Sequence, residues 1–383
     1  MNEMTDTIST MSQGLFDEGE ENPSYLTSQL ITYIGNKRSL LPVIDEILWG
    51  VRDRLGDKKL RTVDLFSGSG VVARLLKKHS SLVVANDLES YSRIINQCFL
   101  TNRKDMPATL ASAVERLNAR ADSGGFTPGF IREMYSPRDE NNIEPHERVF
   151  YTVDNALRLD SFAQWIALED EELRPYLLAP LMSKASVHTN TAGVFKGFYK
   201  DPETKTGTFG GKGKNALSRI LGQIRLEVPI LSNFDSELLV LQEDAATVGR
   251  LLPECDFVYL DPPYNQHPYG ANYFMLNYLH NYVRPASFSE VSGIPTNWNR
   301  SDFNVRTKSL NSLRETVGNL NAKFMLISFN DEGFIAPDDM RDMLKSMGRL
   351  SEVSKSYNTF RGSRNLHSRS DKVTEHLFLL ERA

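Results

Sequence analysis

The hydrophobic positions of the chain fall into short runs that predict buried strands. Six runs of this kind are bounded by turn residues, at 61–66, 82–85, 238–241, 257–260, 323–329 and 376–380. Periodicity of about 3.6 residues predicts a helix over residues 41–55, with Ser39 as its candidate N-cap and Pro42 in its first turn. A second helix is expected at 71–76, between the first two strands. This strand, helix, strand order predicts an α/β fold with a mostly parallel sheet and helices on both faces.

Two segments depart from this pattern. Residues 1–25 carry six acids and no Lys or Arg, so we expect a mobile acidic arm, with the ordered chain beginning near Leu30. Residues 101–232 show no βαβ spacing, which predicts either an inserted domain or a set of long ordered loops. The α/β domain is therefore expected to comprise residues 26–100 and 233–383.

Composition narrows the classes of function. The chain has 383 residues, 40% hydrophobic and 24% charged, with a net charge of -5 and two cysteines, Cys98 and Cys255. These cysteines are too few for a disulfide framework or a metal cluster, which is typical of a reduced cytoplasmic protein. The sequence contains neither a run of about 18 apolar residues nor a secretion signal, so neither a membrane span nor secretion is expected. Residues 184–225, in contrast, hold eight Lys and Arg against two acids, a local charge of +6.

The strand at 257–260 ends in Asp261-Pro262-Pro263-Tyr264. Neither proline can donate to a sheet, so the strand stops there and presents a carboxylate and an aromatic ring at its carboxyl end. Ligands of open α/β sheets bind at that edge. From these four residues alone, a purely structural proline turn explains the pattern equally well.

A glycine-rich turn follows the first strand. It comprises Phe66, Ser67, Gly68, Ser69 and Gly70 and leads into a helix, a setting in which backbone can approach an anionic or nucleoside ligand. Asp87 ends the next strand, where an acid can bind a ribose or cap the following helix.

Three motifs in this order resemble the Dam-like, alpha-ordered adenine-specific DNA methyltransferases. They are Tyr33-Ile34-Gly35-Asn36-Lys37, Asp64-Leu65-Phe66-Ser67-Gly68-Ser69-Gly70 and Asp261-Pro262-Pro263-Tyr264. The resemblance covers most of residues 30–383. It departs at Asn36, where many relatives have a second glycine, so the turn there could differ. The resemblance implies a Rossmann-like methyltransferase fold with an inserted target-recognition region at 101–232.

The resemblance also implies an activity: transfer of a methyl group from S-adenosylmethionine to the N6 amine of an adenine flipped out of duplex DNA at a specific site. It implies catalytic roles for Asp261, Pro262, Pro263 and Tyr264, with no metal. The cofactor residues that it implies are Tyr33, Lys37, Asp64, Phe66, Ser67, Gly68, Gly70, Asp87 and Asp244. Asp244, near the adenine amine of the cofactor in this interpretation, is equally well explained as a loop acid after a strand.

Double-stranded DNA is the expected partner, and a cognate restriction endonuclease is compatible with the resemblance. Candidate DNA contacts are Lys196, Lys200, Lys212, Lys214, Arg361 and Arg364, although charge runs are commonly solvated surface. Asn272 and Tyr273 are candidates to line the target-base pocket, with helix packing as the alternative for Tyr273. Three alternatives stay open: an RNA adenine methyltransferase, a cytosine-N4 methyltransferase, and a catalytically silent DNA-binding module.

Overall fold

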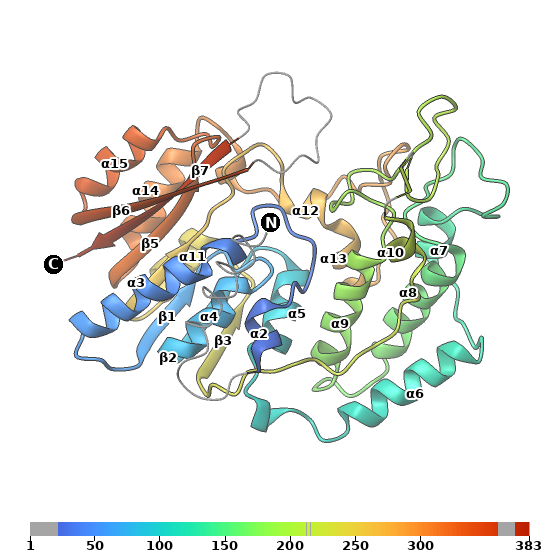
Figure 1. Cartoon of the computed structure of the whole chain (residues 1–383), viewed down its shortest axis with the longest axis horizontal. Coiled ribbons are helices and arrows are strands. Elements are labelled where there is room, and N and C mark those ends of the chain that lie inside the picture. The colour runs from blue at the N-terminus through green and yellow to red at the C-terminus, as the bar shows by residue number, and fades with distance from the viewer. Residues whose placement is uncertain (1–21, 212, 215, 359–371, 383) are drawn as a thin grey trace, which may run out of the picture.

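A seven-stranded mixed sheet organises the computed structural model, which describes residues 22–211, 213–214, 216–358 and 372–382 (Figure 1). The strands are β1 (Leu60–Asp64), β2 (Ser80–Asn86), β3 (Glu237–Leu241), β4 (Cys255–Leu260), β5 (Ala322–Asn330), β6 (Arg349–Asn358) and β7 (Lys372–Glu381). All six predicted strands are present. Strand β6 was not predicted, because its ten residues are mainly polar and it lies at the edge of the sheet.

The strand order is β3-β2-β1-β4-β5-β7-β6. Strands β1 to β5 pair in parallel, whereas β7 runs antiparallel to both β5 and β6. The chain moves outward from β1 to β3 and then returns to β4 on the other side of β1. Because the strand order reverses between β1 and β4, a ligand crevice is expected at their carboxyl ends.

Helices cover both faces of the sheet, which confirms the predicted fold class. One face packs against α2 (Pro23–Thr27), α3 (Leu41–Arg54) and α4 (Val71–His79). The other packs against α11 (Ala245–Leu251), the short 3-10 helix η4 (Asp302–Asn304), α14 (Ser309–Asn319) and α15 (Pro337–Lys345). Each layer buries an apolar core against the sheet.

The N-terminal expectations need two corrections. The described chain is already ordered at α2, where Tyr25 and Leu26 are buried and the Tyr25 hydroxyl donates to the Phe99 carbonyl at 2.8 Å. The expected start near Leu30 was therefore too late. Ser39 does not cap α3, because it lies inside the 3-10 turn η2 (Arg38–Leu40) that precedes this helix.

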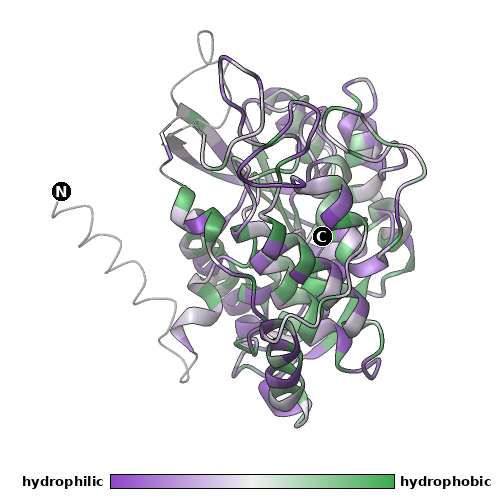
Figure 2. Cartoon of the chain, turned by 90° about the vertical axis from the view of Figure 1, so that its right-hand side faces the viewer, coloured by the Kyte–Doolittle hydropathy of each residue, from purple (hydrophilic) through white to green (hydrophobic). Residues whose placement is uncertain are grey.

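Residues 101–232 combine helices with long connecting segments, such as 136–152 and 188–216. With their neighbours they form α5 (Ser90–Phe99), η3 (Arg103–Asp105), α6 (Leu110–Asp122), α7 (Phe130–Tyr135), α8 (Val153–Ile166), α9 (Arg174–Val187), α10 (Leu217–Leu221), α12 (Tyr269–Asn272) and α13 (Phe274–Asn281). Helices α6 to α9 share one apolar core with α5 and α13, beside the sheet (Figure 1). Figure 2 shows both hydrophobic and hydrophilic residues on the helices of this side of the molecule. The division at residues 100 and 233 therefore runs through a continuous core, and the target-recognition role stays a prediction.

Candidate functional site

The carboxyl ends of β1 and β4 bring two predicted acids to the same edge. Asp64 ends β1 and pairs in register with Tyr259 of β4, while Asp261 follows β4 directly. The Asp64 side chain is buried and its Oδ1 atom has no hydrogen-bond partner among the described residues. Burial, with Asp261 and Asp87 nearby, raises the pKa of Asp64 well above its usual range.

The predicted glycine-rich turn lies beside these acids. Gly68 and Gly70 have φ angles of 50° and 74°, in the left-handed region that favours glycine. A methyl group added at Gly68 would lie 2.8 Å from the Tyr33 hydroxyl oxygen. The missing side chain therefore lets Tyr33 close over the turn.

Asp87 anchors this turn to the end of β2. Its Oδ2 accepts a hydrogen bond from the Gly68 amide at 2.8 Å, and its Oδ1 accepts from the Glu89 amide at 2.9 Å. Helix α5 begins at Ser90 with Glu89 in the N-cap position, so Asp87 is not the helix cap that the alternative interpretation predicted. Burial raises the pKa of the Asp87 carboxyl.

A pocket opens between the glycine turn and the ends of β1 to β4. Its lining includes the aromatic residues Tyr33, Phe66, Tyr269 and Phe303. Five acids also line it: Asp87, Glu89, Glu243, Asp244 and Asp261. Among its described lining residues there is no Lys or Arg. An acid-rich, partly aromatic pocket of this kind suits a ligand that carries positive charge.

Glu89 is a pocket residue that the sequence analysis did not select. Its Oε2 accepts from the Asn277 side chain at 2.7 Å, and burial raises the pKa of its carboxyl to about 7. The sequence could have indicated Glu89 as a pocket residue, because it lies two residues after Asp87 in the same turn. Asp244 combines both of its interpretations, since it lines the pocket and also caps α11 by accepting from the Ala246 amide at 3.0 Å.

Lys37 contacts Asp261 of the Asp261–Tyr264 motif and does not line the pocket. Its Nζ atom lies 3.1 Å from Asp261 Oδ1 and 2.7 Å from Oε1 of Glu375, a β7 residue absent from the predicted site. The Lys37 and Glu375 side chains are 3% and 1% exposed. The pKa of Asp261 is raised to about 7, because burial and the Glu375 carboxylate together raise it by more than the Lys37 ammonium lowers it.

Aromatic packing fixes the N-terminal motif against the site. The Tyr33 ring stacks on Tyr273 and Tyr269, at centroid distances of 4.8 and 5.1 Å. The buried Tyr273 hydroxyl also accepts from the Ile34 amide at 2.8 Å, which supports the packing interpretation of Tyr273. Asn36 fits where relatives have glycine, because Gly35 takes the left-handed φ of 73° and Asn36 Oδ1 accepts from the Arg38 amide.

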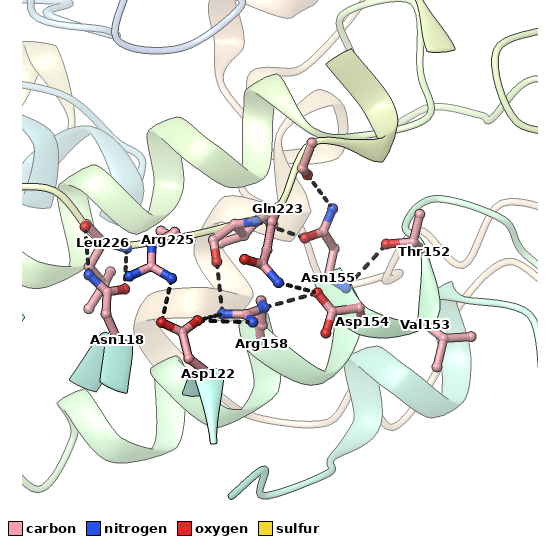
Figure 3. A network of polar contacts seen from close by, with 12 residues as sticks. Asn118, Asp122, Thr152, Val153, Asp154, Asn155, Arg158, Gln223, Arg225 and Leu226 are labelled. Carbon is pink, nitrogen blue, oxygen red and sulfur yellow. Dashed lines mark hydrogen bonds and ion pairs between the residues drawn. The ribbon is translucent and has the colours of Figure 1, made fainter. Parts of the chain in front are cut away.

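Several of the eight basic residues in 184–225 contact other parts of the fold. Lys184 pairs with Glu227 at 2.5 Å, Arg225 pairs with Asp122, and Arg219 donates to the Thr189 carbonyl at 3.1 Å. Figure 3 shows the Arg225 contact within a network that ties this segment to α6 and α8. At its centre Arg158, 3% exposed, lies 2.9 Å from Asp154 and 3.3 Å from Asp122 (Figure 3). The local charge of +6 therefore overstated the free positive charge.

Of the six predicted DNA contacts, Lys196, Lys200 and Lys214 are described, and Lys196 contacts a residue close to the Asp261–Tyr264 motif. Lys196 Nζ lies 3.0 Å from His267 Nδ1, and Lys200 Nζ lies 4.9 Å from the Phe198 ring centroid. Burial lowers the pKa of Lys196, while Lys214 is exposed. Lys212, Arg361 and Arg364 lie outside the described residues.

Expectations of the sequence analysis also concern the cysteines, possible metal ligands and long apolar helices. Cys98 and Cys255 are free and buried. A search of the described residues finds no cluster of metal-ligating side chains. Nor does the same part of the chain contain a helix with the length and hydrophobicity needed to cross a bilayer.

Comparison with known proteins identifies the family. Residues 33–343 match the model of the D12 class N6 adenine-specific DNA methyltransferases. Type II methyltransferase M.CviAII of Paramecium bursaria Chlorella virus 1 is 28% identical, over 91% of this chain and 98% of that protein. Type II methyltransferase M.NlaIII of Neisseria lactamica is 25% identical, over 92% and 99%. Modification methylase StsI of Streptococcus sanguinis is 27% identical over 91% of this chain, which spans 52% of that protein. The chain therefore belongs to the D12 class of N6 adenine-specific DNA methyltransferases, which confirms the predicted enzyme class.

Proposed function

We propose that the acid-lined pocket binds S-adenosylmethionine and that Asp261 presents the N6 amine of a flipped-out adenine to it. The observation that carries this proposal is that the pocket and Asp261 meet at the carboxyl ends of β1 and β4, where the strand order reverses. Bound there, the cofactor supplies an electrophilic methyl group on a sulfonium.

The described residues fit such a cofactor. Its sulfonium and ammonium groups are cationic, and five acids line the pocket. Asp64 lies next to the lining residue Leu65, and its buried Oδ1 has no hydrogen-bond partner among the described residues. We assign Asp64 and Tyr33 to the methionine end, and Phe66, Ser67, Gly68 and Gly70 to the floor beneath it. Asp87 and Glu89 are assigned to the ribose, and Asp244 to the adenine amine.

The catalytic residues act on the target amine. The lone pair of the adenine N6 is delocalised into the ring, so the amine is a poor nucleophile. The Asp261 carboxylate and the Pro262 carbonyl would accept its two hydrogens, which favours a more tetrahedral nitrogen whose lone pair points at the methyl group. Lys37, whose ammonium contacts Asp261, is assigned to orienting that carboxylate instead of to the cofactor.

The target base must leave the duplex to reach this site. Tyr264 offers a face for stacking, with Phe329 edge-on at a centroid distance of 6.2 Å and Pro263 completing the turn. Stacking a base on an aromatic ring contributes about 1–3 kcal/mol, comparable with the cost of unstacking it.

DNA backbone contacts are assigned to Lys196, Lys200, Lys212, Lys214, Arg361 and Arg364, and base recognition to residues 101–232. Because the relatives are named as type II methyltransferases and modification methylases, we also propose a cytoplasmic setting and a cognate restriction endonuclease as partner.

Methylation assays on matched substrates test the proposal. The purified protein is incubated with methyl-labelled S-adenosylmethionine and the same sequence pool as duplex DNA, single-stranded DNA or RNA, and the products are hydrolysed for nucleoside mass spectrometry. The expected product is N6-methyladenine, formed fastest in duplex DNA. Label on cytosine or mainly in RNA would favour those substrates instead. A protein that neither binds nor consumes the labelled cofactor would be the silent module.

A further inference from the structure

Strand β7 delivers a buried acid to the same edge as the catalytic motif. Because β7 runs antiparallel to β5, its first half lies at the carboxyl end of the parallel strands, where Glu375 pairs in register with Asn330. Glu375 is 1% exposed, and its Oε1 accepts a hydrogen bond from the Ser328 hydroxyl at 2.6 Å. Two contacts, from Ser328 and Lys37, therefore converge on one oxygen of a carboxylate deep in the sheet.

Lys37 bridges Glu375 and Asp261. Its ammonium is closer to Glu375, at 2.7 Å, than to Asp261, at 3.1 Å. A buried ammonium is costly without partners, so removing one acid would drive the cation fully onto the other. With Glu375 present, the Lys37 ammonium is held between two carboxylates and does not neutralise Asp261 alone.

This geometry has a consequence for the reacting amine. Asp261 must keep an oxygen available to accept from the adenine amine, yet the Lys37 ammonium competes for the same lone pairs. A second acceptor for the Lys37 ammonium, on the side away from Asp261, limits that competition. Glu375 is the acid that holds this position, and Ser328 fixes its orientation.

We infer that Glu375 is a positioning residue for methyl transfer, which anchors Lys37 so that one Asp261 oxygen stays free for the target amine. This inference rests on the proposed role of Asp261. Substitution of Glu375 should then slow transfer without weakening the binding of cofactor or DNA, since Glu375 does not line the cofactor pocket.

The test is the pH dependence of kcat/KM, which reports the ionisation of the free enzyme. Among the described residues, the titratable groups that face Asp261 are Lys37, Asp64, Tyr259, Tyr264, Tyr269 and Glu375. Of these, Glu375 raises the pKa of Asp261, so Glu375→Gln should move the acid limb of the profile to lower pH by about one unit. On the alkaline plateau, kcat should fall by about tenfold or more while KM for DNA stays within about twofold.

Matched variants separate positioning from folding. Glu352→Gln removes an acid from β6 that pairs with Arg341 at 2.7 Å, and should leave both the profile and kcat unchanged. Glu375→Asp keeps the charge, so its acid limb should stay near that of the wild type while the shorter side chain lowers kcat. If Glu375→Gln does not fold, as judged by circular dichroism, the Glu375→Asp result decides the question.

The inference is overturned if Glu375→Gln has the same acid limb and the same plateau kcat as the control Glu352→Gln. Where Glu375→Gln does not fold, the same comparison is made with Glu375→Asp. Product analysis of the wild-type enzyme keeps the two proposals apart. Wild-type protein that makes no N6-methyladenine in duplex DNA would refute the proposed function itself. Wild-type activity combined with an unaffected Glu375 variant would refute the positioning role alone.

Discussion

Replacing Lys37 with methionine is the perturbation that best isolates the electrostatics of the catalytic carboxylate. The side chain keeps its length and apolar stem but loses the ammonium that lies between Asp261 and Glu375. Two carboxylates would then face each other without a buried cation. Both carboxyl groups should become harder to ionise, so the fraction of enzyme with a charged Asp261 should fall at neutral pH.

The size of the expected pKa shift follows from the distance between Lys37 and Asp261. Lys37 Nζ lies 3.1 Å from Asp261 Oδ1. At an effective dielectric constant of about 20, two unit charges at that separation interact by roughly 5 kcal/mol. Solvent reaches the Asp261 side chain, which is 20% exposed, and reduces this value. A neighbouring opposite charge commonly shifts a carboxyl pKa by about 1–3 units. Loss of the Lys37 ammonium should therefore move the midpoint of the acid limb of the rate profile to higher pH by roughly that amount.

The assay is kcat/KM for methyl transfer to duplex DNA between about pH 5.5 and 9.5. The Lys37→Met profile should move to higher pH, opposite to the shift expected for Glu375→Gln. Lys323→Met is the matched control, since Lys323 pairs only loosely with Glu254, at 3.8 Å, and does not contact Asp261. A Lys37→Met acid limb that coincides with the wild type, or moves to lower pH, would refute the reasoning.

Three further outcomes are expected. Gly68→Ala places a methyl group 2.8 Å from the Tyr33 hydroxyl at a φ of 50°, which costs about 1–2 kcal/mol in backbone strain alone; the variant should have a lower Tm and weaker cofactor binding by calorimetry, and wild-type affinity would contradict this. Alanine at Lys196, Lys200, Lys212 and Lys214 should weaken DNA binding in fluorescence anisotropy and reduce the salt slope by about 0.9 for each lost phosphate contact. Lys345→Ala on α15 serves as the control for this set, and an unchanged slope would place the phosphate contacts elsewhere. Arg158→Met should lower the free energy of unfolding by about 1–3 kcal/mol in urea titrations, because its buried guanidinium holds Asp122 and Asp154; unaltered stability would mean that these ion pairs contribute nothing.

The strands and the edge motifs were predictable because their signals are local. Apolar runs predicted all strands except the polar edge strand β6, and the prolines after β4 correctly marked where that strand ends. The order of the motifs then placed Asp64, Asp87 and Asp261 at one sheet edge. Two helices of residues 101–232, α8 and α9, were missed for a physical reason. Helix α8 is buried on nearly every side, and α9 contains Pro180, so neither shows a clear amphipathic period.

Residues that depend on distant pairing were harder to find. Glu375 lies between Val373 and Leu377 on the buried face of β7, and a lone acid at an inward position was the available signal. Its proximity to Lys37 follows from an antiparallel strand whose register the sequence does not reveal. Similarly, Arg225 belongs to the basic segment by sequence, yet its partner Asp122 lies 103 positions away, so a local charge count could not detect the pair.

Single-turnover methyl transfer by Asp261→Ala tests the central claim most directly. The measurement combines rapid quench with labelled S-adenosylmethionine, calorimetric cofactor binding and anisotropy with duplex DNA. Loss of the carboxylate should slow transfer by about 10²–10³-fold or more, because it removes a preorganised acceptor at the reacting amine. Cofactor and DNA affinities should stay within a few-fold of the wild type. A near-normal transfer rate in this variant would contradict the assignment of Asp261 as the residue that orients the adenine amine.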